Sequence, residues 1–458
     1  MRRLLTAAIA AGMLATAGVS AGEPVVPVLA WSAEQAAARA CARSPELEAA
    51  RAEAEAARAS ARGAYAAFWP KIDLEGSWRY VTEVPELSLE LPGPMPSQVG
   101  PIEMGDHVQY AVGPRLDWTL WDSGARRHAW KASRSALAAQ AARVESVRRD
   151  IVLDVRRTYV RAQTAAARLD VIDEALDLAR AQARDIRRRA AAGSAARMDV
   201  IASRLEVADR ERERLQAQEE LILALRALLF RIRPEDVDDA RPALAGTDAA
   251  ASASVVIRLE SPADSLAGVS AGSGAPSEGR LPQVEVLRHR SEAAEASAAA
   301  GRAGRGPRFQ VFAKSSWEYP NLTVREEVWQ NAAGVSAAWT LFDAGRIGRR
   351  AEEQAQQGHA LRSRAEDLSK HLHLRREEAR DRLARLEREA DLLIRRVDDT
   401  RELARLTYAA YRAGRVNYLD VQTANLRALR ARTEHTANLG ARLMQFAVLE
   451  NLAEEAAP

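Results

Sequence analysis

The sequence predicts a mostly α-helical chain that also contributes strands to a transmembrane β-barrel, and three observations support this fold class. Much of the chain occurs twice, so that residues 118–124 recur as residues 339–345. Each copy contains a long Ala-, Arg- and Glu-rich run with helical spacing. Each copy also contains two segments in which apolar and polar residues alternate. The chain therefore consists of two copies of one unit, namely a helix, a strand pair, a long helix and a returning helix.

The N-terminal segment has the pattern of an export signal. Arg2 and Arg3 precede an apolar run over residues 4–19, and small residues around Ala21 form a cleavage site. This run is shorter than the ~20 apolar residues that a membrane-spanning helix needs. We therefore expect a cleaved signal peptide and an exported protein without a transmembrane helix.

The composition favours long helices over a set of globular cores. Hydrophobic residues make up 47% of the chain, but aromatic residues only 5%, and charged residues 28%. Lys and Arg number 66 against 63 Asp and Glu, and the two signs are interleaved along the chain. This pattern predicts solvated helix faces and no nucleic-acid partner. Cys41 is the only cysteine, so no internal disulfide is possible, and we expect a buried or idle thiol.

The two copies define the domain organisation. Pro70 recurs as Pro307 with an offset of 237, whereas Gly193 recurs as Gly414 with an offset of 221. The difference in length therefore lies mainly in one loop, which is longer in the first copy. Two copies with so long a period indicate an internal duplication rather than a solenoid. We expect a signal peptide, a first repeat, a flexible connector or equatorial segment, and a second repeat at residues 1–21, 22–230, 231–281 and 282–458.

The helices of each copy are predicted from apolar residues at spacings of three and four. In the first long helix Leu137, Ala141 and Val144 begin such a stripe, which is typical of coiled coils. At about 1.5 Å per residue, a helix of about seventy residues is on the order of 100 Å long. The Pro-, Gly- and Ser-rich connector is predicted to be disordered around 260–280. The expected helices are 32–67, 122–190, 198–230, 282–303, 344–412 and 420–453.

The strands are predicted from alternation with a period of two. Ile72, Leu74 and Trp78 lie on one face of the first strand, with charged residues between them. Transmembrane strands show this pattern, and so does a soluble sheet whose apolar face packs on a core. Four strands cannot close a barrel, and an open edge does not persist in lipid, so three chains would supply twelve strands. The expected strands are 70–81, 107–121, 307–319 and 328–342.

No enzymatic motif is present. The sequence has no HExxH, nucleophile elbow, P-loop or GxGxxG motif. His371 and His373 are two residues apart and would point to different faces of a helix. We therefore expect no catalytic residue, no cofactor and no metal site.

The duplicated order of elements resembles the TolC family of outer-membrane factors. The resemblance rests on a strand pair that ends in WTLWDSG or WTLFDAG, a long helix, and a turn of the form G-x5-DV. It implies a homotrimer in the cell outer membrane, in contact with outer-membrane lipid. Its 12-stranded barrel would continue into a long periplasmic tunnel of coiled-coil helices.

The resemblance also implies a function and partners. Such channels complete tripartite efflux pumps or type I secretion systems, and conduct substrates from a periplasmic adaptor (membrane fusion) protein and an inner-membrane RND or ABC transporter. The sequence does not identify the exported substrate, because fold alone does not decide function. A periplasmic coiled-coil adaptor or scaffold without a pore is the alternative. It would explain the helices but not the strands joined to them.

The turns after the long helices become the periplasmic tips in this interpretation. Gly193 and Gly414 are expected to end the long helices, and Asp199 and Asp420 to be N-caps of the returning helices. The tip residues expected to contact the adaptor are Gly193, Ser194, Gly414 and Val416.

Other tip residues correspond by resemblance to the periplasmic gate. Asp420 would form a ring of three carboxylates that attracts cations. Family members carry a second acidic ring one helical turn further on, where this chain has Thr423, so the ring would be weaker.

The family also closes its gate through Tyr–Asp and Arg–Asp contacts. Tyr411 and Asp199 match the Tyr–Asp contact, which we expect to act as a latch. Val416 occupies the position of the Arg, so the second contact is lost unless Arg415 replaces it.

The repeated motif marks the junction between barrel and tunnel. Its residues are Trp118, Asp122, Gly124, Trp339, Asp343 and Gly345. The Asp is expected to cap the helix start, and the Gly to permit the bend because it lacks a Cβ atom. The Trp is expected to lie near the membrane interface.

Overall fold

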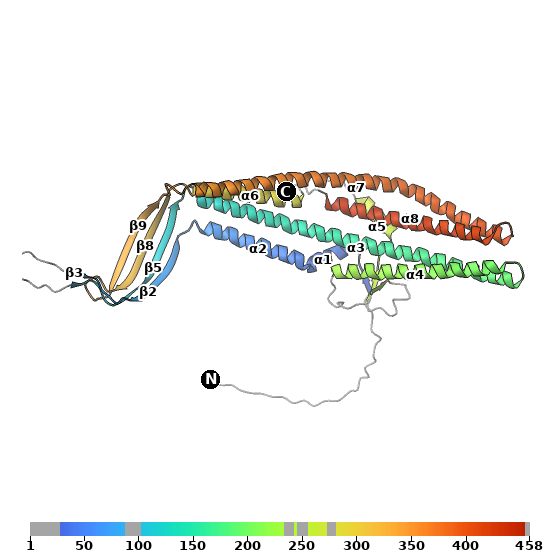
Figure 1. The fold of residues 1–458 in the computed structure, drawn as a ribbon, viewed down its shortest axis with the longest axis horizontal. Coiled ribbons are helices and arrows are strands. Elements are labelled where there is room, and N and C mark those ends of the chain that lie inside the picture. The colour runs from blue at the N-terminus through green and yellow to red at the C-terminus, as the bar shows by residue number, and fades with distance from the viewer. Residues whose placement is uncertain (1–27, 88–101, 233–241, 245–254, 273–280, 454–458) are drawn as a thin grey trace, which may run out of the picture.

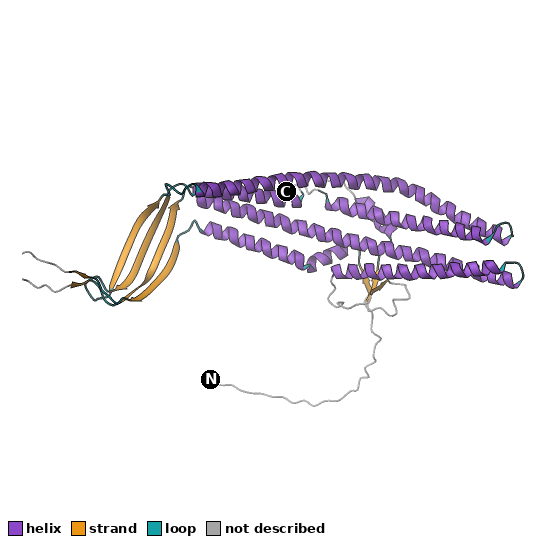
Figure 2. Ribbon diagram, viewed as in Figure 1, coloured by secondary structure: helices purple, strands orange, loops and turns teal. Residues whose placement is uncertain are grey.

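The computed structural model describes residues 28–87, 102–232, 242–244, 255–272 and 281–453. The expected signal peptide, residues 1–21, lies outside the described residues. The chain is elongated, with a sheet at one end and long helices over the rest of its length (Figure 1). Figure 2 shows the larger sheet at one end of the helices and a few short strands beside the helices midway along the molecule.

Two long antiparallel hairpins form most of the helical part. Helix α3 (Ala125–Ala191) turns back into α4 (Arg197–Ile232), and α7 (Arg346–Arg412) turns back into α8 (Tyr418–Asn451). Helix α3 also packs against α8, and α6 (Pro282–Ala303) packs between α3 and α7. Small and apolar residues at coiled-coil spacing allow this packing, because they form a continuous stripe on each helix. The predicted helices in these segments are confirmed.

The single helix predicted over residues 32–67 is wrong. Two helices occupy this segment, α1 (Ala33–Arg43) and α2 (Pro45–Ala66). Pro45 has no backbone N–H to continue α1, and it is well suited to the first turn of a new helix. The Ser44 side chain accepts a hydrogen bond from the N–H of Leu47 and so caps α2.

The connector is more ordered than its composition predicts. Strands β6 (Pro242–Leu244) and β7 (Val255–Arg258) form a parallel sheet with β1 (Val28–Ala30). Helix α5 (Pro262–Gly272) follows and packs against α8. Disorder around 260–280 is therefore wrong for residues 262–272, because Leu266 is buried against Val160 and Leu443.

Four antiparallel strands form the sheet at the end of the molecule. They are β2 (Lys71–Tyr80), β5 (Val108–Trp121), β8 (Arg308–Tyr319) and β9 (Val328–Ala338), in the order β2-β5-β8-β9. A short hairpin, β3 (Glu86–Leu87) and β4 (Ile102–Glu103), lies in the loop between β2 and β5. The last strand ends at Ala338 rather than at 342, because β9 is an edge strand and β8 begins only at Arg308.

The sheet has one apolar and one polar face. The pairing places Ile72 opposite Leu116, and Trp118 opposite Val311, so apolar residues meet across the strands. The other face pairs Arg115 with Glu75 and Asp117, and Lys314 with Glu318. The apolar face consists mainly of Ile72, Leu74, Trp78, Tyr80, Val112, Leu116, Trp118, Val311, Trp317, Trp329 and Val335.

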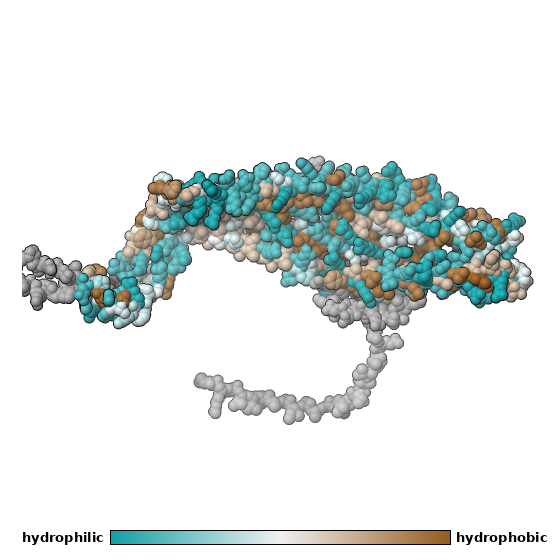
Figure 3. All heavy atoms as spheres, viewed as in Figure 1, coloured by the Kyte–Doolittle hydropathy of each residue, from teal (hydrophilic) through white to brown (hydrophobic). Residues whose placement is uncertain are grey.

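Among the described residues, no core packs against this apolar face. Leu74 is 76% exposed and Trp329 63%, which separates the sheet from a soluble two-sided one. The visible surface of the helical part is mostly hydrophilic with scattered hydrophobic residues (Figure 3). None of the described helices is long and apolar enough to cross a membrane.

Candidate functional site

The two turns at the far end of the hairpins share one geometry. Gly193 and Gly414 have φ values of 73° and 71°, in the left-handed region that favours glycine. The N–H of Ser194 donates to the carbonyl of Arg189 at 2.8 Å. The N–H of Arg415 donates to the carbonyl of Ala410 at 2.9 Å. Both long helices therefore end in the same Schellman-type turn, as a duplication requires.

A cluster of tyrosines closes the space between the two hairpins at this end. Tyr411 and Tyr418 are 8% and 2% exposed and pack against Ile186 and Val421. The rings of Tyr411 and Tyr418 are 5.6 Å apart, and those of Tyr408 and Tyr411 are 6.3 Å apart. Residues of α3, α4, α7 and α8 thus share one small core, which we call the tip cluster.

Two tyrosine–aspartate hydrogen bonds link the hairpins beside the tip cluster. The Tyr411 hydroxyl donates to Oδ2 of Asp199 at 2.9 Å, so the structure brings together the pair predicted from the resemblance. The Tyr408 hydroxyl donates to Oδ2 of Asp185, also at 2.9 Å. Burial and the bond to Asp185 raise the pKa of Tyr408 to about 12, and burial and Asp199 likewise raise the pKa of Tyr411.

The expected N-cap roles of Asp199 and Asp420 are wrong. Helix α8 begins at Tyr418, two residues before Asp420, and Asn417 is its N-cap. Asp420 is the third helical residue, and its carboxylate accepts the N–H of Asn417 at 3.2 Å in a capping box. Asp199 is likewise the third residue of α4, and it accepts the hydroxyl of Tyr411. Both aspartates lie one turn further into the helix than expected.

The remaining predicted tip residues lie on the surface around these bonds. Asp420 and Thr423 are exposed, and the Thr423 hydroxyl donates to the carbonyl of Leu419. Val416 packs on the tip cluster, and Arg415 is exposed. Within the described part of this single chain, the Arg415 side chain forms no ion pair.

Sequence reasoning missed a polar contact between α4 and α8. The Gln422 amide donates to the carbonyl of Ala202 and to Oε2 of Glu206, both at 3.3 Å. Glu206 lies 3.4 Å from Arg210, whose side chain is 9% exposed. Burial raises the pKa of Glu206. Glu206 and Arg210 are four residues apart on one helix, and from this spacing their ion pair could have been predicted.

The junction residues form the same contacts in both copies. The Trp118 indole donates to the carbonyl of Phe68 at 3.0 Å, and the Trp339 indole donates to that of Arg305 at 2.9 Å. Gly124 and Gly345 have φ values of 91° and 80°. Each indole thus ties the end of a strand to the segment that leads into the preceding strand.

The two junction aspartates cap the long helices from two residues before the N-cap. Asp122 accepts the N–H groups of Gly124 and Arg126, and Asp343 accepts those of Gly345 and Ile347. The capping role expected for both residues is therefore present in the geometry, although Gly124 and Gly345 are the N-cap residues themselves.

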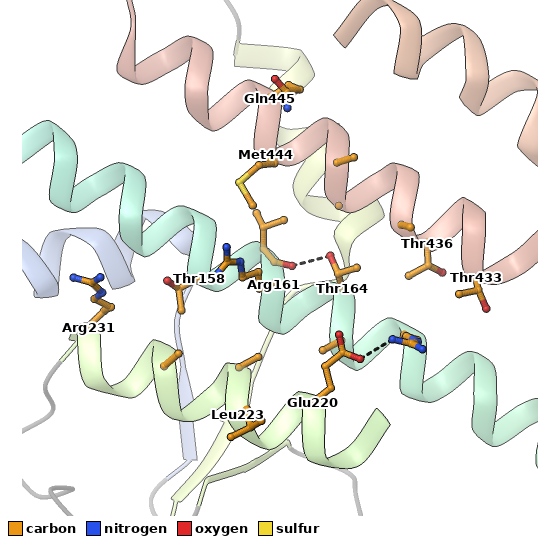
Figure 4. A pocket seen from close by; sticks show the side chains of 18 of the residues that line it. Thr158, Arg161, Thr164, Glu220, Leu223, Arg231, Thr433, Thr436, Met444 and Gln445 are labelled. Atoms are coloured by element: carbon orange, nitrogen blue, oxygen red, sulfur yellow. Dashed lines mark hydrogen bonds and ion pairs between the residues drawn. The ribbon is translucent and has the colours of Figure 1, made fainter. Parts of the chain in front are cut away.

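An open groove of about 1020 Å³ lies midway along the helices, between α4 and α8 over α3. Figure 4 shows Thr164, Glu220 and Thr436 around it, with Arg231 at one end. Glu220 pairs with Arg168 at 2.6 Å. The groove holds no arrangement of a nucleophile and a base. No group of three or more His, Cys, Asp or Glu side chains among the described residues is placed to hold a metal ion.

Cys41 has no part in these sites. Its Sγ atom faces the carbonyl of Arg148 at 4.0 Å, and burial raises the pKa of the thiol. A raised pKa disfavours the reactive thiolate.

Comparison with known proteins gives one family and a set of similar structures. The family described as outer membrane efflux protein matches residues 36–230 and 277–453. A comparison with curated proteins finds no significant match.

The similar structures share the fold over nearly the whole chain. CusC is 18% identical, with a TM-score of 0.74 over 93% of this chain and 92% of that one. VceC from Vibrio cholerae is 19% identical, with a TM-score of 0.70 over 92% and 96%. The open state of MtrE from Neisseria gonorrhoeae is 16% identical, with a TM-score of 0.65 over 92% and 89%.

Proposed function

Because the chain belongs to the outer membrane efflux protein family, we propose that it is the outer-membrane channel of a tripartite efflux or type I secretion system. Three copies would close a twelve-stranded barrel continuous with a periplasmic helical tunnel. Substrates would pass through it without a chemical step, delivered by an adaptor protein and an RND or ABC transporter of the inner membrane. The family is one of channels rather than of enzymes.

The observation that carries this proposal is the sheet. Its apolar face is solvent-exposed in the single chain, and its edge strands β2 and β9 have open edges. Exposed apolar surface is stable in lipid, but open strand edges are not. Both features are satisfied when β9 of one chain pairs with β2 of the next.

The tip cluster supports a closed periplasmic end. The bonds from Tyr411 and Tyr408 hold the α7/α8 hairpin against the α3/α4 hairpin. Opening the tunnel requires these hairpins to separate, so we assign both bonds to the latch of the gate. Exposed Asp420 would then line the entrance in three copies.

Membrane fractionation and conductance test the proposed function. We expect a detergent-extracted trimer from the outer membrane that conducts ions in planar bilayers. A monomer or dimer in the soluble periplasmic fraction, without conductance, would instead support a coiled-coil adaptor or scaffold and would refute the channel.

Neutralising Asp420 tests its place at the entrance. Asp420→Asn keeps an oxygen that can accept the Asn417 N–H, and we expect it to lower the cation-to-anion permeability ratio about threefold. Asp420→Arg should lower the ratio further, because it adds a positive ring. Reversal potentials in a salt gradient measure this ratio. If both variants keep the wild-type ratio, Asp420 does not face the pore.

A further inference from the structure

Positive charge is concentrated near the junction in the first copy. The chain as a whole carries 66 Lys and Arg against 63 Asp and Glu. Residues 56–72 and 123–144 nevertheless contain no Asp or Glu, although they hold several Arg and Lys. These two segments include the end of α2 and the start of α3, which lie side by side next to the sheet (Figure 1).

Six of these residues form one surface, which we call the α2/α3 patch. Its members are Arg62, Tyr65, Arg127, Trp130, Lys131 and Arg134. The four cationic side chains are exposed, and Tyr65 is 50% exposed. The spacing of residues 127, 131 and 134 places them on one face of α3. None of the four cations forms an ion pair with a described residue.

Ring contacts join the two helices within the patch. The rings of Tyr65 and Trp130 are 5.8 Å apart, and the Arg134 guanidinium lies 5.1 Å from the centre of the Trp130 ring. Two aromatic rings and four unpaired cations thus form a continuous surface.

A chain of contacts connects the apolar face of the sheet to the α2/α3 patch. Trp118 belongs to that face, and its indole donates to the carbonyl of Phe68. The Phe68 ring in turn lies 5.9 Å from the Tyr65 ring. Contacts therefore continue without a break from the lipid-type surface of the sheet to the patch.

The patch also lies at the right depth for lipid headgroups. From Ala125, Arg134 is nine residues along α3, or about 14 Å at 1.5 Å per residue. Side chains on a helix point toward its N-terminus, which for α3 but not for α2 lies next to the sheet, and long cationic side chains extend their charge further. Tyr and Trp are enriched at the boundary between hydrocarbon and water.

The duplicated copy shows that the fold does not require the patch. The corresponding positions in α6 and α7 are Ala299, Arg302, Gly348, Ala351, Glu352 and Ala355. The equivalent helices pack beside the same kind of junction with neither aromatic ring and with an acid in place of Lys131. Packing at the junction therefore does not account for the composition of the patch.

We propose that the α2/α3 patch binds the phosphate-bearing headgroup of an anionic phospholipid in the periplasmic leaflet of the outer membrane. The cations pair with the phosphate, and the rings of Tyr65 and Trp130 lie against the glycerol backbone and the first acyl carbons. This inference rests on the proposed placement of the sheet in that membrane. A trimer would carry three such sites.

Native mass spectrometry of the detergent-purified trimer tests the site. The probes are phosphatidylglycerol and phosphatidylethanolamine, titrated separately. A basic residue near an anionic surface contributes a factor of about five to binding. We therefore expect Arg127→Gln/Lys131→Gln/Arg134→Gln to weaken phosphatidylglycerol binding at least about tenfold. The matched control is Arg346→Gln/Arg349→Gln/Arg350→Gln, which removes the same charge at the same level of the second copy and should change binding less than about twofold.

The proposal is overturned if the patch variant binds phosphatidylglycerol like the wild type, if the control loses binding equally, or if the wild type binds both lipids alike. Conductance of the same preparations distinguishes a failure of the lipid-site proposal from a failure of the proposed channel function. Trimers that conduct but show no preference refute the patch alone, whereas a protein that neither assembles nor conducts refutes both.

Discussion

Tyr408 and Tyr411 lie one helical turn apart on α7, and each donates to a different helix of the other hairpin. Asp185 belongs to α3 and Asp199 to α4, so the two bonds resist both sliding and rotation of α7. A hydrogen bond to a charged group contributes about 1.5–3 kcal/mol. Two such bonds therefore stabilise the arrangement in which the two hairpins are in contact at the tip.

Removing the two hydroxyls should open the tip. We expect Tyr408→Phe/Tyr411→Phe to raise the open probability at least about tenfold, since each lost bond destabilises the closed state by about 1 kcal/mol or more. Single-channel recording measures this quantity. Tyr80→Phe, which alters an exposed tyrosine at the other end of the molecule, is the control. Equal open probabilities for the double variant and the wild type would remove both tyrosines from the latch.

The same pair predicts how the tip responds to alkaline pH. An unfolded tyrosine has a pKa of about 10, whereas Tyr408 has a pKa of about 12 in the fold. The protonated hydroxyl therefore stabilises the tip fully below pH 10, and this stabilisation is lost as the pH rises toward 12. We expect the protection factors of amides near the tip, which are exchange rates corrected for base catalysis, to fall in this window, and Tyr408→Phe to flatten this dependence. A wild-type profile that is already flat would show that the hydroxyl is not held protonated.

At the scale of elements, the sequence predicts helices and strands that have a regular periodicity, but not local breaks or short elements without one. Long helices and alternating strands follow from periodicity, which is an average over many residues. The break at Pro45 is a single-residue event inside an Ala-rich run, and α5 is formed from a segment whose composition favours disorder. Pro114 in β5 lies where the described pairing with β8 is interrupted, so the sheet contains a proline, a residue that disfavours regular central strands.

The contacts of the candidate site could likewise be predicted from the sequence only in part. Tyr411 and Asp199 could be paired from the resemblance, because both positions match the family pattern. Tyr408 and Asp185 could not, since nothing in their spacing along the chain indicates a contact between α7 and α3. The N-cap of α8 was misplaced because Asn417 and Asp420 are both good capping residues, and only the geometry decides between them.

The start of each long helix yields a prediction from its aspartate. Removing a capping carboxylate costs about 0.5–2 kcal/mol. Asp122 also forms an ion pair with Arg126 at 2.8 Å, with side chains only 13% and 17% exposed. We therefore expect Asp122→Ala to lower the melting temperature of the trimer more than Asp343→Ala, whereas Asn at either position, which retains an acceptor, should cost less. A larger loss at Asp343 would contradict this ranking.

At the scale of the whole molecule, the duplication predicts how the strands of neighbouring chains would pair. Strand β9 is the second-copy equivalent of β5, and β2 is the first-copy equivalent of β8. Within the chain, β5 pairs with β8, so β9 should pair with β2 of the next chain in the corresponding register. Within the chain, Trp118 lies opposite Val311, so Trp339 should lie opposite Leu74 of the next chain. Likewise Leu116 lies opposite Ala313, so Ala337 should lie opposite Gly76.

This register is consistent with both faces of the sheet. It extends the pairing of β9 beyond Ala338, so Leu341 and Phe342, 78% and 87% exposed in the single chain, would gain a neighbouring strand. The strand predicted to reach residue 342 would then form only in the assembly. The equivalent of Arg115 opposite Lys314 is Ser336 opposite Ser77, on the polar face.

Cysteine pairing tests the register directly. Residues opposite one another in an antiparallel sheet have Cα atoms about 4.5–5.5 Å apart, within the range that a disulfide spans. In a Cys41→Ser background, Ser77→Cys/Ser336→Cys should give covalent dimers and trimers on a non-reducing gel after mild oxidation. Ser77→Cys/Ala332→Cys is the control, because Ala332 lies on the same face but about 13 Å further along the strand. Cross-linking of the control alone would place the seam in another register, and cross-linking of neither pair would show that β9 and β2 do not meet. Covalent trimers from the Ser77 and Ser336 pair alone would mean that the contact between subunits copies the contact between repeats, with one β5–β8-like interface occurring six times around the barrel.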